Sequence, residues 1–256
     1  MSRVDDYREK LKSASEWEPY LLAESGLPGP RGNLELAAAF AAEAAPSQIW
    51  RYAGLLPEAA PGGTALEFLA FCGVLGLGRF LIGGDQKALR LLRERAADPR
   101  WRVREAVAMA LQRLGDVEMA RLLRIAAEWS SGTFFEQRAA VAALCEPRLL
   151  KGKSHAQATL KMLDRVTAGL AKAPGRREEG FKALRKALGY GWSVAVVALP
   201  EEGRPRLERW FGADDPDVRW VMSENLKKAR LARLDASWVR ACQAKLSGKA
   251  RPARGR

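Results

Sequence analysis

Residues able to carry catalysis are few and scattered in this chain. Its only histidine, His155, lies in the basic segment KGKSHAQ, without a serine or cysteine motif that would make a nucleophile. A solvated surface histidine explains it better than a general base. Cys72, Cys145 and Cys242 form no CxxC pair and have no histidine cluster nearby. We therefore expect no disulfide framework, no metal site and a reduced, cytoplasmic compartment.

Three glycines, Gly73, Gly76 and Gly78, have the order GxxGxG, not the GxGxxG of dinucleotide sites, and no clear strand precedes them. Close helix packing explains them better. No cofactor is expected.

Arginines recur at one position of a repeated helical pattern. They are Arg104, Arg138 and Arg219. Two interpretations remain open: a structural ladder with acidic residues of neighbouring turns (Asp98, Asp116 or Asp215), or contact with a ligand. Arg104 borders an apolar stripe whereas Arg102 falls on the polar side, so replacing Arg104 is expected to destabilise the fold more.

Trp220 is predicted on the outward face of its helix, with Glu224 and Lys227. An exposed ring beside a lysine could stack a base while the ammonium group meets a phosphate. The alternative is that the ring packs under a neighbouring helix or under the C-terminal tail. The tail 247–256 is predicted to be a disordered electrostatic arm, since its residues larger than alanine or proline are cationic: Lys249, Arg251, Arg254 and Arg256.

The charge of the chain is unevenly distributed. Of its 256 residues 48% are hydrophobic, and the net charge is +13. Residues 1–100 carry 12 Lys/Arg and 13 Asp/Glu, whereas residues 151–256 carry 24 and 11. A basic C-terminal half favours acidic partners, with nucleic acid first and an acidic protein second. A compositional bias that uses arginine for solubility is the alternative.

Neither a leader nor a membrane anchor is expected. The opening MSRVDDYREKLK lacks the apolar run of a signal peptide. The apolar stretch 68–78 is about half the roughly 20 residues that a spanning helix needs, so it is predicted to be a buried helix.

Helical spacing dominates the chain and predicts a dozen or so helices. Capping boxes are predicted at Ser15 with Glu18, Thr64 with Glu67, and Thr133 with Glu136, and helix caps at Asp85, Asp116 and Asp235. Connections are expected at 61–63, 83–84, 173–175 and 200–205, where glycine and proline gather.

The clearest repeated unit runs from Asp85 to Gly115, as two helices joined by an Asp98-Pro99 turn. Its segment DPRWRVREAVAMALQRLGD resembles the HEAT-repeat signature. Copies follow at 116–145 and at 214–229, with room between them for a unit whose helices span about 154–171 and 178–188. The resemblance implies an all-α, HEAT-like helical-repeat solenoid of stacked antiparallel helix pairs.

WRVREAVAMAL and DVRWVMSENLKKA also resemble the HEAT-like alkylpurine DNA glycosylases. That resemblance implies an aspartate near a tryptophan, which stabilises the sugar cation formed as a damaged base leaves. The matching spacing, Trp210 to Asp214, leads into an Asp-Asp-Pro turn and not into a helix. No catalytic residue is therefore assigned.

The predicted organisation is a divergent helical cap or divergent repeats over 1–84, HEAT-like repeats over 85–246 and the tail 247–256. The expected function is noncatalytic binding of nucleic acid or an acidic protein through the basic C-terminal half. The alternative is a DNA glycosylase acting on alkylated bases. The oligomeric state stays open.

Overall fold

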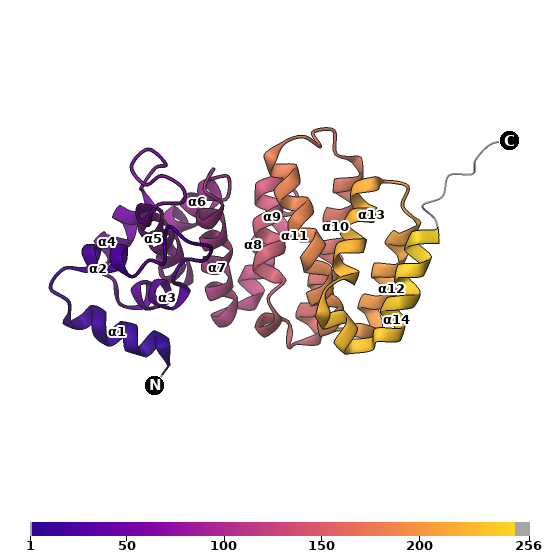
Figure 1. The fold of residues 1–256 in the computed structure, drawn as a ribbon, viewed down its shortest axis with the longest axis horizontal. Helices are drawn as coiled ribbons and strands as arrows, with labels where there is room; N and C mark the ends of the chain where they lie inside the picture. Colours follow the sequence, from indigo (N-terminus) through magenta and orange to yellow (C-terminus); the bar gives the residue numbers. More distant parts are fainter. Residues whose placement is uncertain (1, 249–256) are drawn as a thin grey trace. The chain divides into compact units, whose positions relative to one another are not determined.

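The computed structural model describes residues 2–248 of the chain. Within that range the chain forms fourteen α-helices and two short 3-10 helices and contains no strand, so the all-α prediction is confirmed (Figure 1). The chain divides into two compact units, residues 1–118 and 119–256. They are called unit 1 and unit 2 below, and each is described by itself.

Unit 1 contains the first seven helices. These are α1 (Arg3–Ser13), α2 (Trp17–Ala23), α3 (Leu34–Glu43), α4 (Pro46–Ala53), α5 (Ala65–Ile82), α6 (Gln86–Arg95) and α7 (Trp101–Val117). Helix α5 is the centre of the unit, because α2, α3, α4, α6 and α7 all pack against it. Most of its residues are buried for that reason.

Helix α5 is long and apolar enough to cross a membrane by composition, but its burial inside unit 1 is that of a core helix. Its glycines allow this packing. A Cβ atom on Gly73 would lie 2.1 Å from the main-chain nitrogen of Ala53 in α4, and one on Gly78 would lie 3.1 Å from the main-chain oxygen of Ala110 in α7. The predicted packing role of these two glycines is confirmed.

Unit 2 contains the other seven helices. These are α8 (Met119–Trp129), α9 (Phe134–Leu144), α10 (Lys153–Lys172), α11 (Glu179–Ala198), α12 (Pro200–Arg209), α13 (Pro216–Leu226) and α14 (Ala229–Gly248); the 3-10 helices are η1 (Pro147–Leu150) and η2 (Trp210–Gly212). The second helices of successive pairs form a layer in which α11 lies between α9 and α13 (Figure 1).

Helix α11 continues ten residues past its predicted end at Leu188. Two glycines beyond that point let its neighbours approach closely. A Cβ atom on Gly189 would lie 3.2 Å from the ring of Trp220 in α13, and one on Gly191 would lie 2.9 Å from Sγ of Cys145, just after α9. These glycines are packing positions and not helix terminators.

Four local predictions are wrong. The side chain of Thr64, at the start of α5, forms no cap hydrogen bond and instead donates to the main-chain oxygen of Pro61 (2.7 Å), so Thr64 and Glu67 form no capping box. Helix α2 begins at Trp17 without a side-chain cap, so Ser15 and Glu18 form no capping box. Asp116 lies inside α7 and does not start a helix. Residues 200–205 form the first part of α12 and are not a connection. Pro200 occupies the first helical position, where its missing N–H costs nothing.

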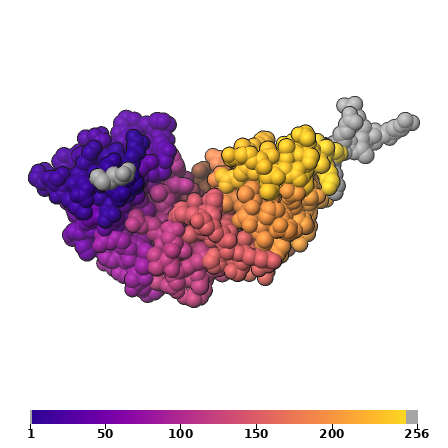
Figure 2. Space-filling model, turned by 90° about the horizontal axis from the view of Figure 1, so that it is seen from below, coloured from indigo at the N-terminus to yellow at the C-terminus, as the bar shows by residue number. Residues whose placement is uncertain are grey.

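The last helix, α14, changes direction at Asp235, whose φ of −166° is not helical. Oδ1 of Asp235 accepts from the main-chain N–H of Trp238 (2.9 Å), so the aspartate caps the second part of the helix as predicted. In Figure 2, α14 covers one face of unit 2 in yellow. The helix includes Ser247 and Gly248, the first two residues assigned to the tail.

Candidate functional site

The positive charge of the chain belongs to unit 2. Residues 1–118 carry 15 Lys/Arg and 16 Asp/Glu, whereas residues 119–256 carry 28 and 14. A polyanion would therefore be attracted to unit 2 and not to unit 1. The basic side chains of unit 2 that form no ion pair with a carboxylate are the ones available to such a polyanion.

Helix α11 presents a row of exposed side chains. Lys182, Lys186 and Tyr190 follow one another at a spacing of four residues, and all three are exposed. The two lysines form no ion pair within residues 2–248. The Tyr190 ring, 44% exposed, continues the row. This row offers two uncompensated cations and one aromatic surface.

Trp220 lies against α11 and not in open solvent. Its half-buried ring packs on the main chain at Gly189, and the guanidinium carbon of Arg185 lies 4.1 Å from the ring centroid. Arg185 also donates to Oδ1 of Asp217 (2.5 Å). The ring therefore anchors Arg185, which favours the packing alternative for Trp220 over an open stacking platform.

The end of α13 and the start of α14 extend the basic surface. Arg230 lies over the Tyr190 ring at 4.4 Å and donates to its hydroxyl group. Exposed Lys227 is paired with Glu224. The pKa of Glu224 is lowered, first by the hydrogen bond from Lys227 and further by the charges of Lys227, Lys228 and Arg185. We define the α11–α13 face as residues Lys182, Lys186, Tyr190, Lys227, Lys228 and Arg230.

Two of the three predicted repeat arginines bind main-chain oxygens. Arg104 is buried and donates to the main-chain oxygens of Asp98 (2.7 Å) and Pro99 (3.0 Å). Arg219 donates to the main-chain oxygen of Leu246 (2.5 Å). Arg138 is half-buried. These contacts of Arg104 and Arg219 go to main-chain oxygens and not to the carboxylates that the ladder hypothesis names.

The carboxylate of Asp98 is instead bound by Arg100, a residue that no sequence pattern singled out. Both side chains are buried, with Nη2 of Arg100 at 2.7 Å from Oδ2 of Asp98. The same guanidinium donates to the main-chain oxygens of Ala60 and Leu55. Those residues are distant in the sequence, so periodicity could not reveal this contact.

Periodicity places Arg102 on the polar side of α7, but that side is not solvated at this position. Its side chain is 12% exposed and donates to Oε2 of Glu67 (3.1 Å) and to the main-chain oxygen of Gly29 (2.7 Å). Arg102 and Arg104 are thus both held by buried hydrogen bonds. The structure gives no reason to expect a greater loss of stability from replacing Arg104.

The four tail residues Lys249, Arg251, Arg254 and Arg256 lie outside the described residues. Trp210 forms no hydrogen bond with Asp214, whose side chain is exposed. The indole N–H of Trp210 donates instead to Oδ1 of Asp164 (3.0 Å). Asp164 is also paired with Arg206 (2.7 Å) and Arg209 (2.8 Å), so this carboxylate is already satisfied. Within residues 2–248, no group of three or more His, Cys, Asp or Glu side chains is placed to hold a metal ion.

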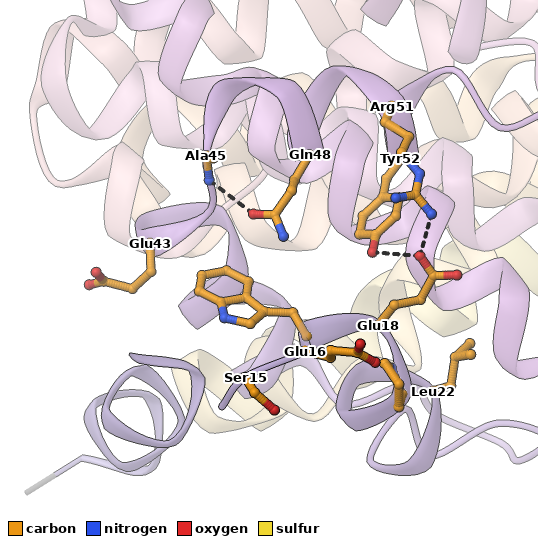
Figure 3. A pocket seen from close by; sticks show the side chains of 11 residues that line it. Ser15, Glu16, Glu18, Leu22, Glu43, Ala45, Gln48, Arg51 and Tyr52 are labelled. Atoms are coloured by element: carbon orange, nitrogen blue, oxygen red, sulfur yellow. Dashed lines mark hydrogen bonds and ion pairs between the residues drawn. The ribbon is translucent and has the colours of Figure 1, made fainter. Parts of the chain in front are cut away.

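Unit 1 has a cavity of about 820 Å³ between α2 and α4 (Figure 3). Glu18 accepts there from Arg51 (2.5 Å) and from the hydroxyl group of Tyr52 (3.0 Å). Burial, with the bond to Glu18, raises the pKa of Tyr52. Glu43, at the other end, is paired with Arg8 (2.5 Å). Two of the three carboxylates in the cavity wall are therefore already neutralised.

Comparison with known families agrees with the repeat signature. Residues 71–148 match the family of HEAT repeats. The match contains the complete helix pairs α6–α7 and α8–α9, so the prediction of HEAT-like repeats is confirmed. No curated protein and no solved structure matches the chain. The resemblance to DNA glycosylases stays a prediction.

Proposed function

We propose that this protein, a member of the HEAT-like repeat superfamily, is a noncatalytic scaffold that binds nucleic acid along its α11–α13 face. HEAT-like repeats form extended helical surfaces that bind other macromolecules. The observation that carries the proposal is the row of Lys182, Lys186 and Tyr190, because its two ammonium groups have no acidic partner within residues 2–248. Such groups are available to neutralise phosphates.

The chemistry favours contact with the phosphate backbone over the reading of base edges. Lysine is a flexible point charge that meets phosphate oxygens without a fixed geometry. Arg230, which lies over Tyr190, adds a guanidinium plane on which a base could stack. We therefore expect binding with little sequence preference and a strong dependence on salt.

The test compares two charge-matched double variants of the full chain. Lys182→Gln with Lys186→Gln removes the two cations of the face. Lys161→Gln with Arg165→Gln is the control, since these residues are exposed on α10, lack ion pairs within residues 2–248 and have the same spacing. Each variant binds labelled duplex and single-stranded DNA in anisotropy titrations from about 50 to 200 mM salt.

The face variant should bind more weakly at low salt, and its log–log salt slope should be smaller by about 1.8 on duplex and about 1.4 on single-stranded DNA. The control should keep the slope of the unmodified protein. Equal losses in both variants would mean that total charge, and not this face, governs binding. No binding by the unmodified protein at about 50 mM salt would refute the proposal and leave an acidic protein as the partner.

A further inference from the structure

A second cavity of unit 1 is small and apolar. It measures about 170 Å³ and lies between the loop before α3, the helix α5 and the start of α7. Its apolar walls are Leu27, Pro30, Leu34, Phe68, Phe71 and Trp101. Apolar cavities hold water poorly, so an apolar group that fills this one gains free energy.

Trp101 at the cavity is 52% exposed, although indole rings are usually buried to a greater extent. The guanidinium carbon of Arg102 lies 4.5 Å from the centroid of its ring. The exposed indole surface adjoins the apolar wall. A bound group can therefore bury both surfaces at once, as the anchor side chains of protein interfaces do.

The cavity is formed before anything binds. Arg102 holds the loop wall by donating to the main-chain oxygen of Gly29, and it is held in turn by the fully buried Glu67. These contacts join the loop, α5 and α7 across three separate parts of unit 1. A site fixed in this way requires little ordering when it binds.

The charges at the cavity favour an acidic neighbour. Arg31 lines it, is exposed and forms no ion pair within the described part of the chain. The charge of Arg102 is balanced by Glu67. Glu105 is the one carboxylate in the wall and lies on α7, while Arg31 lies on the loop. A carboxylate that flanks the bound apolar group on the loop side of the cavity would meet Arg31, whereas one on the α7 side would meet Glu105.

We propose that this cavity binds one bulky apolar side chain, phenylalanine or leucine, from an acidic peptide segment of a partner protein. The volume of about 170 Å³ favours a single side chain over a whole small molecule as the occupant, because sites for small molecules usually measure about 300–1,000 Å³. One anchored side chain needs a flanking chain to supply further contacts, and exposed Trp101 and Arg31 offer them. The site lies in unit 1, so it does not depend on the nucleic-acid proposal.

A substitution at Gly32 can close the cavity without breaking the fold. It lines the cavity, its φ is not in the left-handed region, and a Cβ atom on it would meet the Phe68 ring at an ordinary 3.7 Å. Gly32→Leu should therefore fill the space from within. Gly62→Leu is the control, since Gly62 is exposed in another loop of unit 1 and its Cβ would also make only an ordinary contact.

The probes are blocked pentapeptides with Phe, Leu or Ala at the centre and Glu on both sides, together with a Phe peptide flanked by Lys. Binding is followed by fluorine NMR of the fluorotryptophan-labelled full chain, in which Trp101→Phe identifies the Trp101 signal. The Glu-flanked Phe and Leu peptides should shift that signal saturably, at least about tenfold more tightly than the Ala peptide. Gly32→Leu should abolish the shift, and Gly62→Leu should preserve it. Arg31→Glu should weaken binding several-fold and provides a second test that leaves the cavity wall intact.

The proposal fails if neither apolar peptide shifts the Trp101 signal, or if Gly32→Leu leaves the shift unchanged while circular dichroism shows a folded chain. Equal binding of the Lys-flanked peptide would refute the acidic partner. A shift caused by free indole but by no peptide would identify a small-molecule cavity instead. A Trp101 shift on concentrating the protein alone would identify a second copy of this chain as the occupant.

Discussion

Asn225 joins the two helices that carry the α11–α13 face, and its replacement tests how that face is positioned. The residue is fully buried in α13. Its Oδ1 accepts from the main-chain N–H of Ser193 (2.8 Å), and its Nδ2 donates to the main-chain oxygens of Leu188 (2.8 Å) and Val221 (2.8 Å). Two of these bonds reach α11 on either side of Tyr190, so one carboxamide fixes α11 against α13.

The expected loss of stability follows from the number and burial of these bonds. Asn225→Ala removes three hydrogen bonds, each of which contributes about 1 kcal/mol net. It also leaves main-chain groups of α11 without their side-chain partner in the interior, and an unsatisfied buried group costs about 1–3 kcal/mol. We expect the free energy of unfolding of unit 2 to fall by about 3–5 kcal/mol. Ser223→Ala, on the same helix and half-buried, should change it by less than about 0.5 kcal/mol.

The buried cysteines allow each unit to be followed separately. Cys145 and Cys242 lie in unit 2, where burial raises the pKa of their thiols to about 12 and about 11, and Cys72 is fully buried in unit 1. All three should react with a thiol reagent only after local unfolding. Labelling along a urea gradient should show Asn225→Ala exposing Cys145 and Cys242 at lower urea. A change below about 1 kcal/mol at both thiols would refute the assigned role of the carboxamide.

Two further predictions concern packing and pH. Gly73→Ala should destabilise unit 1 by about 3 kcal/mol, because the new Cβ would overlap main-chain atoms of α4. Gly169→Ala should stabilise unit 2 by about 0.5–1 kcal/mol, because no atom lies within 4 Å of the new Cβ. Urea titrations that give both changes the same sign would contradict this expectation. The pKa of Glu208 is lowered, chiefly by the hydrogen bond from the indole N–H of Trp238 and then by the hydrogen bond from Lys245. The ionised carboxylate therefore stabilises unit 2 at pH values above the ordinary glutamate pKa, and this stabilisation is lost as pH falls through the lowered pKa. Glu208→Gln should flatten the decline in stability of unit 2 on acidification, and an unchanged acid titration of stability would exclude this contribution.

Features that depend on near neighbours in the sequence could be predicted. Helix α6 begins after Asp85, whose Oδ1 accepts from the main-chain N–H groups of Lys87 and Ala88. Thr133 and Glu136 form their capping box. The helix pairs α6–α7 and α8–α9 lie where the repeat signature puts them. These features need only periodicity and hydrogen bonds within one turn of helix.

Features that depend on distant residues could not be predicted. Glu18 does not complete a capping box because Arg51 and Tyr52, more than thirty residues away, bind its carboxylate. Trp220 is on the outward side of α13 by periodicity, yet the glycine at position 189 lets α11 approach and cover it. Helical periodicity gives the direction of a side chain but not which neighbouring helix lies there.

The same limit applied to the candidate site. The total charge indicated the C-terminal half, but the sequence could not separate cations that are free from cations that are paired. Arg176 and Arg185 are as basic as Lys182, yet both are bound by Asp217. Lys182 and Lys186 on α11 have no ion pair within residues 2–248, whereas Asp217 of α13 binds Arg185, one residue before Lys186.

The different charges of the two units bear on how an acidic partner protein would be told apart from nucleic acid. A basic surface attracts any polyanion, so the α11–α13 face alone cannot distinguish the two. Discrimination requires a short-range feature that fits one partner and not the other. The apolar cavity beside Trp101 is such a feature, because a phosphate backbone offers no bulky apolar side chain to fill it. Contact there depends mainly on burial, which salt hardly weakens, whereas phosphate contacts at the face are screened. If the protein keeps an acidic partner but releases nucleic acid as the salt concentration rises, the partner is bound at the cavity beside Trp101 and the nucleic acid at the α11–α13 face.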